Sequence, residues 1–259
     1  MNNTKPHILL VDDNEDILDF LVSDLGEKYT VLTAHNGHEA LQVLAGETVQ
    51  LVVSDIMMPV MDGFELCKAI KSDIDNSHIP VILLTAKNTL QSKIEGLETG
   101  ADAYIEKPFS PEHLQVQVAN LLMNRVKIKE YFAQSPLVHM RSMAYSKADE
   151  QFLESLNNFV YERMDDVQFD VEHLARLMNM SRPTLYRKIK AISNLTPNEL
   201  INITRLKKAA QLLTEGNLKI SEVAGTVGYT SVTHFGRNFQ KQFGTTPTEF
   251  LKKKGVSGE

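Results

Sequence analysis

Polar and charged side chains follow four short apolar runs in the first half of this 259-residue chain. Asp12 and Asp13 follow the first run, Asp55 the second, Thr85 the third and Lys107 the fourth. Parallel strands in an open α/β sheet deliver their C-terminal ends to one crevice, so these side chains are expected to meet. Three acids, a hydroxyl and an ammonium together suit a phosphate group and a divalent cation, with one aspartate available as a nucleophile.

The elements that must position these side chains alternate along the first half of the chain. Short apolar runs predict strands near 7–11, 29–34, 50–54, 80–84 and 102–105. Amphipathic stretches predict helices near 14–25, 36–45, 62–72, 89–99 and 110–124. This alternation predicts an α/β domain over residues 5–124, a doubly wound five-stranded parallel sheet with helices on both faces.

The second half lacks strand-like alternation and predicts an all-α domain over residues 149–254. Its amphipathic stretches predict helices near 147–164, 171–178, 182–191, 197–214, 220–227, 231–243 and 247–254. Two short helix-turn-helix patterns lie within it, one after the other. Residues 125–148 are expected to form a linker, and apolar side chains such as Phe132 and Leu137 suggest that this linker docks.

The net charge of −6 combines an acidic half with a basic half. Residues 1–124 contain 7 Lys and Arg against 19 Asp and Glu, whereas residues 125–259 contain 20 against 14. Within residues 181–254 the basic residues number 13 and the acidic residues 4. This asymmetry indicates a control module joined to a binder of polyanions, and ordinary surface variation is the alternative.

Composition and motifs argue against several other classes of protein. No apolar run approaches the roughly 20 residues that span a bilayer, and the single cysteine, Cys67, suits a reducing compartment. We therefore expect a cytoplasmic protein without direct membrane contact. The sequence holds no Walker loop and no histidine in a recognisable kinase motif, so we do not expect an enzyme.

The polar residues of the first half belong to longer motifs. These are Asp12-Asp13, Asp55 with the following Met58-Pro59 and Met61-Asp62-Gly63, Thr85-Ala86, and Lys107-Pro108-Phe109. With this set, residues 5–124 resemble the receiver domain of two-component response regulators, which has a flavodoxin-like fold. The resemblance implies that Asp55 accepts a phosphoryl group from a histidine kinase, in a separate protein or in a longer parent chain.

The resemblance also implies roles for the neighbouring groups. Asp13, Asp55 and the main-chain carbonyl of Met57 are expected to bind Mg²⁺, with Asp12 close by or acting through water. Lys107 is expected to pair with the phosphoryl oxygens, Thr85 to donate a hydrogen bond to one of them, and Tyr104 to change rotamer as a switch. Taken singly, these residues have simpler explanations: the first two acids could cap a helix, Asp55 could be a turn residue, and Lys107 could be a solvated charge.

The basic half resembles the DNA-binding domain of AraC/XylS-type regulators. The first helix-turn-helix pattern spans residues 171–190, where Asn179 suits a turn, Ser181 a helix cap and Pro183 the first helical turn. The second spans residues 220–243, where Gly228 suits the turn. The family's tail pattern appears as Phe235, Arg237, Phe239, Lys241, Gly244 and Pro247. The residues expected to face DNA are Arg182, Thr184, Tyr186, Arg187, Ser231, Val232, Thr233 and Arg237. Five lysines, Lys188, Lys190, Lys207, Lys208 and Lys241, are expected to contact phosphates or solvent.

Together the two resemblances predict a phosphorylation-controlled, sequence-specific transcription regulator. Expected partners are double-stranded DNA, a histidine kinase, RNA polymerase and a second copy of the chain on phosphorylation, and activation is favoured over repression. The same pair of domains also ends large hybrid sensor kinases, so the chain could be the C-terminal part of one. The functional alternative is a phosphotransfer or adaptor protein whose helical half binds protein. Operator sequence, stimulus and dimer face cannot be derived from the sequence.

Overall fold

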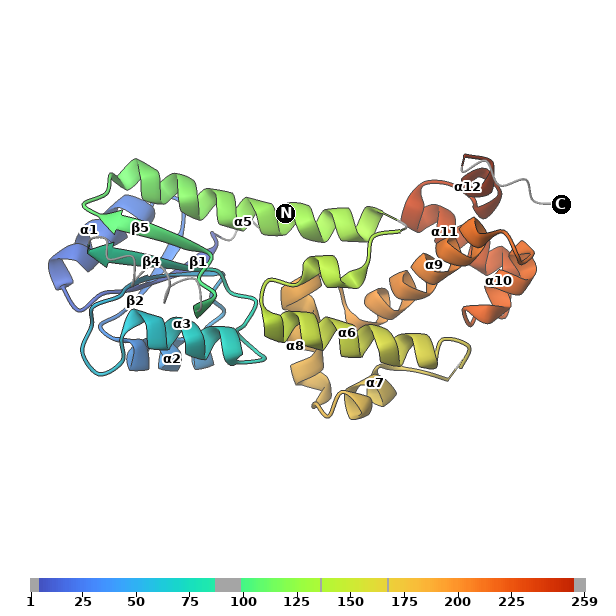
Figure 1. Cartoon of the computed structure of the whole chain (residues 1–259), viewed down its shortest axis with the longest axis horizontal. Coiled ribbons are helices and arrows are strands. Elements are labelled where there is room, and N and C mark those ends of the chain that lie inside the picture. Colours follow the sequence, from blue (N-terminus) through green and yellow to red (C-terminus); the bar gives the residue numbers. More distant parts are fainter. Residues whose placement is uncertain (1–4, 87–98, 136, 167, 254–259) are drawn as a thin grey trace. The chain divides into compact units, whose positions relative to one another are not determined.

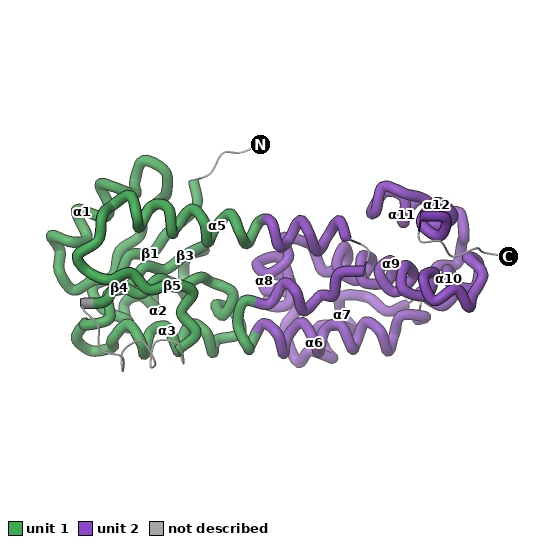
Figure 2. Tube along the Cα trace, turned by 45° about the horizontal axis from the view of Figure 1, so that its top comes forward, with its two compact units in different colours: residues 1–126, 145–148 green, residues 127–144, 149–259 purple. Residues whose placement is uncertain are grey.

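The computed structural model describes residues 5–86, 99–135, 137–166 and 168–253. The chain forms two compact units (Figure 2). The first contains residues 1–126 and 145–148, and the second contains residues 127–144 and 149–259. Each unit has its own hydrophobic interior, so each is described by itself.

A five-stranded parallel sheet organises the first unit and confirms the predicted fold. Its strands are β1 (His7–Val11), β2 (Thr30–Ala34), β3 (Leu51–Asp55), β4 (Val81–Ala86) and β5 (Ala103–Lys107). Their order in the sheet is β2-β1-β3-β4-β5, and all neighbours run parallel. The C-terminal ends of all strands therefore lie along the same edge of the sheet.

Helices cover both faces of this sheet (Figure 1). Helices α1 (Glu15–Leu25) and α5 (Pro111–Gln134) lie on one face, and α2 (Gly37–Gly46) and α3 (Gly63–Ser72) lie on the other. Successive strand residues point to opposite faces, so Ile8 and Leu10 enter one core and Leu9 and Val11 the other. The helix predicted over 89–99 lies outside the described residues except for Thr99.

Helix α5 is longer than the sequence pattern predicted. It was expected to end at residue 124 but continues to Gln134. Residues 125–134 contain neither Gly nor Pro, and Phe132 is fully buried in the core of the second unit, which stabilises the added turns. Helical backbone is disfavoured just before a proline, which explains why the helix stops before Pro136. Residues 127–144 thus belong to the helical unit, although they were expected to lie in a linker.

The second unit is all-α, as predicted. After a short 3₁₀-helix, η1 (Met140–Met143), come α6 (Lys147–Glu162), α7 (Val171–Leu177), α8 (Arg182–Ser193), α9 (Pro197–Glu215), α10 (Ile220–Thr226), α11 (Val232–Phe243) and α12 (Pro247–Lys253). Their apolar faces form one core, which includes residues of α9 such as Leu206 and of α11 such as Phe235.

The two tight turns, α7 to α8 and α10 to α11, have the backbone that the sequence predicted. Asn179 has a φ of 53° and Gly228 a φ of 79°, both in the left-handed region. A Cβ at position 228 would lie 2.3 Å from the main-chain oxygen of Met164, so only glycine fits there. Ser181 caps α8 by accepting a hydrogen bond from the Thr184 amide at 3.2 Å.

Candidate functional site

Three charged side chains converge at the C-terminal edge of the sheet. The Lys107 ammonium at the end of β5 lies 2.6 Å from Oδ1 of Asp55 and 3.0 Å from Oδ2 of Asp12. Both carboxylates are buried, at 7% and 2% exposure respectively. The side chains that follow these three strands therefore lie together, as predicted, with Lys107 between the two carboxylates.

The main chain holds the second oxygen of each carboxylate. The Met57 amide donates to Oδ2 of Asp55 at 2.8 Å, and the Asn14 amide donates to Oδ1 of Asp12 at 3.0 Å. Gly63 opens α3 so close to this loop that a Cβ would lie 2.2 Å from the main-chain oxygen of Asp55. Glycine after Asp62 therefore allows α3 to pack directly behind the acidic residue.

The electrostatics of the cluster favour a charged lysine. Burial alone would lower the pKa of Lys107, because burial penalises the charged form. Hydrogen bonds to Asp55 and Asp12 outweigh this effect and raise the pKa of Lys107 above its ordinary value. The ammonium thus partly balances two buried carboxylates that would otherwise repel each other.

An open pocket of about 580 Å³ adjoins this cluster. Asp13 and Met57 line it, and the Met57 side chain is 75% exposed. No three His, Cys, Asp or Glu side chains converge as a metal site in the described part of the chain. The donors that are present still fit Mg²⁺, which keeps several waters and takes carboxylate and carbonyl oxygens. Within the described residues the Met57 carbonyl accepts no hydrogen bond, so it is available as such a ligand.

The second candidate surface lies on α8 and α11. Arg182, Tyr186 and Arg187 of α8 are exposed, and Thr184 is half-buried next to the capping Ser181. On α11 and at its cap, Ser231, Val232, Thr233 and Arg237 are all exposed. Leu185 and Phe235 of the same helices are buried, so each helix has one face in the core and one face in solvent.

Comparisons with known proteins match a family model to each of the two parts of the chain that carry these sites. Residues 8–119 match the family model described as response regulator receiver domain, and residues 174–253 match one described as helix-turn-helix domain. The chain joins a response regulator receiver domain to an AraC-type helix-turn-helix domain.

Individual relatives include proteins much longer than this chain. "Histidine kinase P4" of Formosa agariphila is 41% identical over 249 residues, which are 96% of this chain and 18% of that protein. "Probable transcriptional regulator ycf27" of Porphyra purpurea is 41% identical over 131 residues, 49% of this chain and 52% of that one. A solved receiver domain of a histidine kinase from Syntrophus aciditrophicus has 37% identity and a TM-score of 0.45, covering 46% of this chain and 91% of its own. This chain therefore spans 18% of the length of the first relative and about half of the length of the second.

Two further predicted site residues of the receiver domain, Thr85 and Tyr104, lie on β4 and β5. Thr85, at the end of β4, is half-buried and makes no hydrogen bond to the cluster within the described residues. The hydroxyl of Tyr104 lies 3.2 Å from Oγ1 of Thr99. Burial raises the pKa of this tyrosine above its ordinary value. The Lys107–Pro108 peptide bond is cis.

Two lysines of the helix-turn-helix domain differ from prediction. Lys188 and Lys207 were expected at phosphates or in solvent, but they are only 1% and 7% exposed. Lys188 forms an ion pair of 2.6 Å with Asp149 of α6, and both side chains are fully buried. The sequence around these two lysines does not reveal their burial. Both lie on helices that are basic and amphipathic, and only contacts from distant segments decide which lysine is covered.

No described helix combines the length and the apolar character needed to cross a membrane.

Proposed function

We propose that the chain is a phosphorylation-controlled, sequence-specific DNA-binding transcription regulator, and that Asp55 is the phosphoacceptor. The supporting observation is the buried Asp55 carboxylate, held by the Met57 amide and paired with Lys107. A phosphoryl group arriving from a phosphohistidine would form a P–O bond to Asp55 as its P–N bond breaks. Lys107 is then close enough to exchange its carboxylate partner for a phosphoryl oxygen.

A bound Mg²⁺ would neutralise negative charge where the phosphoryl group meets the acids. Asp13, Asp55 and the Met57 carbonyl are the proposed ligands, with Asp12 close by. Thr85 is proposed to donate a hydrogen bond to a phosphoryl oxygen. Tyr104 is proposed to change rotamer when it does so, which would require its hydroxyl to leave Thr99.

For DNA we propose that α8 and α11 enter successive major grooves. Their exposed residues Arg187 and Arg237 can each reach guanine with two hydrogen bonds, an arrangement that contributes about 1–3 kcal/mol of discrimination per base pair. The buried faces of both helices, at Leu185 and Phe235, keep these arginines on a rigid support.

Partners beyond DNA are proposed from the family and its relatives. A histidine kinase must supply the phosphoryl group, and the relative named as a histidine kinase raises the proposal that the kinase lies in the same parent chain. Activation through RNA polymerase, dimerisation on phosphorylation and the absence of enzyme activity are further parts of this proposal.

The test is selection of random duplex DNA on the full chain, with and without beryllofluoride, a mimic of the phosphoryl group. We expect an enriched motif with two half-sites about one duplex turn apart, bound more tightly with the mimic. Asp55→Asn should bind the same motif without responding to the mimic. Affinity should fall steeply with salt if phosphates are contacted.

Two results would count against the proposal. If the mimic strengthened DNA binding by Asp55→Asn as much as by the wild type, Asp55 would not be the phosphoacceptor. No enrichment in either state, together with a salt-insensitive complex with a protein, would favour the adaptor alternative.

A further inference from the structure

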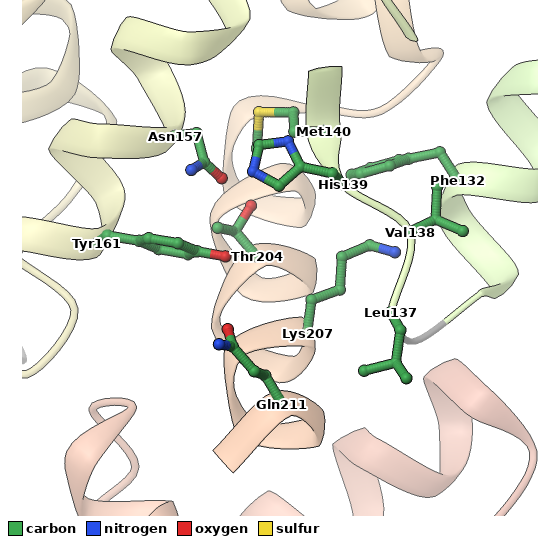
Figure 3. Close-up of a pocket in the computed structure, with 10 residues that line it drawn as sticks. All are labelled: Phe132, Leu137, Val138, His139, Met140, Asn157, Tyr161, Thr204, Lys207 and Gln211. Carbon is green, nitrogen blue, oxygen red and sulfur yellow. The ribbon is translucent and has the colours of Figure 1, made fainter. Parts of the chain in front are cut away.

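A cavity of about 120 Å³ lies within the helical unit. Three segments surround it: α6, α9 and the stretch from the end of α5 to η1 (Figure 3). The residues that line it are Phe132, Leu137, Val138, His139, Met140, Asn157, Tyr161, Thr204, Lys207 and Gln211. None of the eight residues expected to face DNA is among them, although Lys207 was expected at phosphates or in solvent.

Lys207 supplies the cavity with a buried positive charge. Its ammonium donates a hydrogen bond to the main-chain oxygen of Ser135 and lies 4.3 Å from the centroid of the Phe132 ring. No carboxylate of the described residues pairs with it. Burial accordingly lowers the pKa of Lys207 to about 8. An ammonium carries three donors, and the protein uses one of them here.

Asn157 supplies a second polar group that the protein leaves unpaired. Its side chain is only 6% exposed, and the structure gives its amide no hydrogen bond to any described residue. Thr204, by contrast, donates its hydroxyl proton to the Leu200 carbonyl at 2.8 Å. Buried amides are nearly always hydrogen-bonded, so a free one facing a cavity points to a ligand. A water molecule could satisfy Asn157 but would leave the charge of Lys207 uncompensated.

Phe132, Leu137, Val138 and Met140 form an apolar wall, while His139, Tyr161 and Gln211 add further polar groups to the lining. Phe132 is fully buried, Met140 is 3% exposed, and Val138 packs against the same core. One cation beside an apolar wall matches a ligand with a single negative charge and a short hydrocarbon part. A cavity of about 150 Å³ holds benzene, so this one admits a ligand of roughly six heavy atoms at most.

We propose that this cavity binds a short-chain monocarboxylate, with its carboxylate at Lys207 and Asn157 and its alkyl group against Phe132, Val138 and Met140. A doubly charged phosphate would leave one charge unmatched inside the protein, which is unfavourable. The single ammonium therefore selects a monoanion.

Such a ligand would connect the segments that build the cavity. It would bridge α9, which also packs against α8, α10 and α11, and the chain between α5 and η1. Binding would stabilise the support of both helix-turn-helix motifs without involving Asp55. The helical unit would thereby have a chemical input independent of phosphorylation.

Calorimetric titration of the full chain with sodium butyrate tests the proposal, against sodium chloride at equal ionic strength. We expect saturable binding with a Kd on the order of 1 mM, as befits a ligand of this size. Lys207→Met, which keeps most of the length of the side chain but removes the charge, should weaken binding at least tenfold. Lys127→Met, an exposed lysine of α5, is the matched control and should bind as the wild type does.

A second variant keeps the test decisive if Lys207→Met does not fold. Val138→Phe retains the ammonium but fills the apolar side of the cavity, and should also abolish binding. Failure of the folded wild type to bind butyrate at concentrations far above the expected Kd would overturn the proposal. So would equal binding by Lys207→Met, or an equal response to chloride. DNA selection on Asp55→Asn would be unaffected by any of these results, so the two proposals fail separately.

Discussion

Lys107 of the receiver domain and Lys207 of the helix-turn-helix domain are both withdrawn from solvent, but only the first has carboxylate partners. Lys107 contacts two acids, and its pKa is raised. Lys207 contacts a carbonyl and an aromatic ring, and its pKa falls to about 8. The comparison teaches that carboxylates within reach, more than burial alone, decide whether the pKa of a lysine withdrawn from solvent rises or falls.

Lys188 is the extreme case of the same comparison. Its side chain is fully buried, and its ammonium lies 2.6 Å from Oδ1 of Asp149, so it is both covered and paired. These three lysines, with the exposed Lys190 as a baseline, form a series in which burial and pairing vary separately. Substituting each of them separates the two effects.

Lys188→Met should have the largest effect on stability. The substitution removes the cation that pairs with the buried Asp149 carboxylate, which costs about 3–5 kcal/mol. Denaturant unfolding followed by circular dichroism measures the loss. The double variant Asp149→Leu, Lys188→Met should recover most of it, because no buried charge remains. A single variant as stable as the wild type would show that Asp149 reaches solvent.

Lys107→Met should have the next largest effect, in the receiver domain. Asp12 and Asp55 would then face each other without a cation, which we expect to cost about 2 kcal/mol in a metal chelator. If the proposed Mg²⁺ site is correct, added Mg²⁺ should stabilise this variant more than the wild type. Lys68→Met, at an exposed position of α3, is the control. Equal stability of the Lys107 variant in chelator and in Mg²⁺ would contradict the metal site.

Lys207→Met should stabilise the chain at pH 7, by about 1 kcal/mol, because an unpaired buried charge is removed. The folded pKa of Lys207 is about 8, and an unfolded lysine titrates near 10.4. Between these values the unfolded chain binds more protons, so the contribution of Lys207 to the free energy of unfolding rises with pH. The advantage of the variant should therefore shrink from pH 7 to pH 10. An advantage independent of pH would show that Lys207 is uncharged throughout.

Lys190→Ala should have the smallest effect on stability, below about 0.5 kcal/mol, because the side chain is exposed. If α8 binds DNA as proposed, the slope of log affinity against log salt should fall by about 1, since one phosphate contact is lost. Filter binding across a salt series measures this slope. A change in base preference without a change in slope would place Lys190 at a base edge instead.

Much of the receiver domain could be predicted because its signals are local. Alternating apolar runs predicted the strands, and the position of Asp12, Asp55 and Lys107 just after three of those runs predicted their meeting. The turns at Asn179 and Gly228 could also be predicted, because a left-handed backbone favours these residue types. Tyr104 could not be placed in this way, since its contact with Thr99 depends on how side chains settle beside the sheet.

The helical half contains features that local sequence patterns could not predict. A lysine on an amphipathic helix has the same local sequence whether or not another segment covers it, so the burial of Lys188 and Lys207 was not predicted. Nor was the extension of α5 to Gln134, which places Phe132 in the second core. The cavity beside Lys207 depends on the same distant contacts.

The sequence by itself determined the two domain types, the parallel sheet, the acidic residues at its edge and the turns of both helix-turn-helix motifs. Each of these follows from short-range periodicity or from the backbone preference of a single residue. Only the tertiary structure decided which lysines are covered, which acids reach them and where an unpaired charge meets a cavity. Burial and electrostatic partnership arise between residues far apart in the chain, and they exist only once the chain has folded.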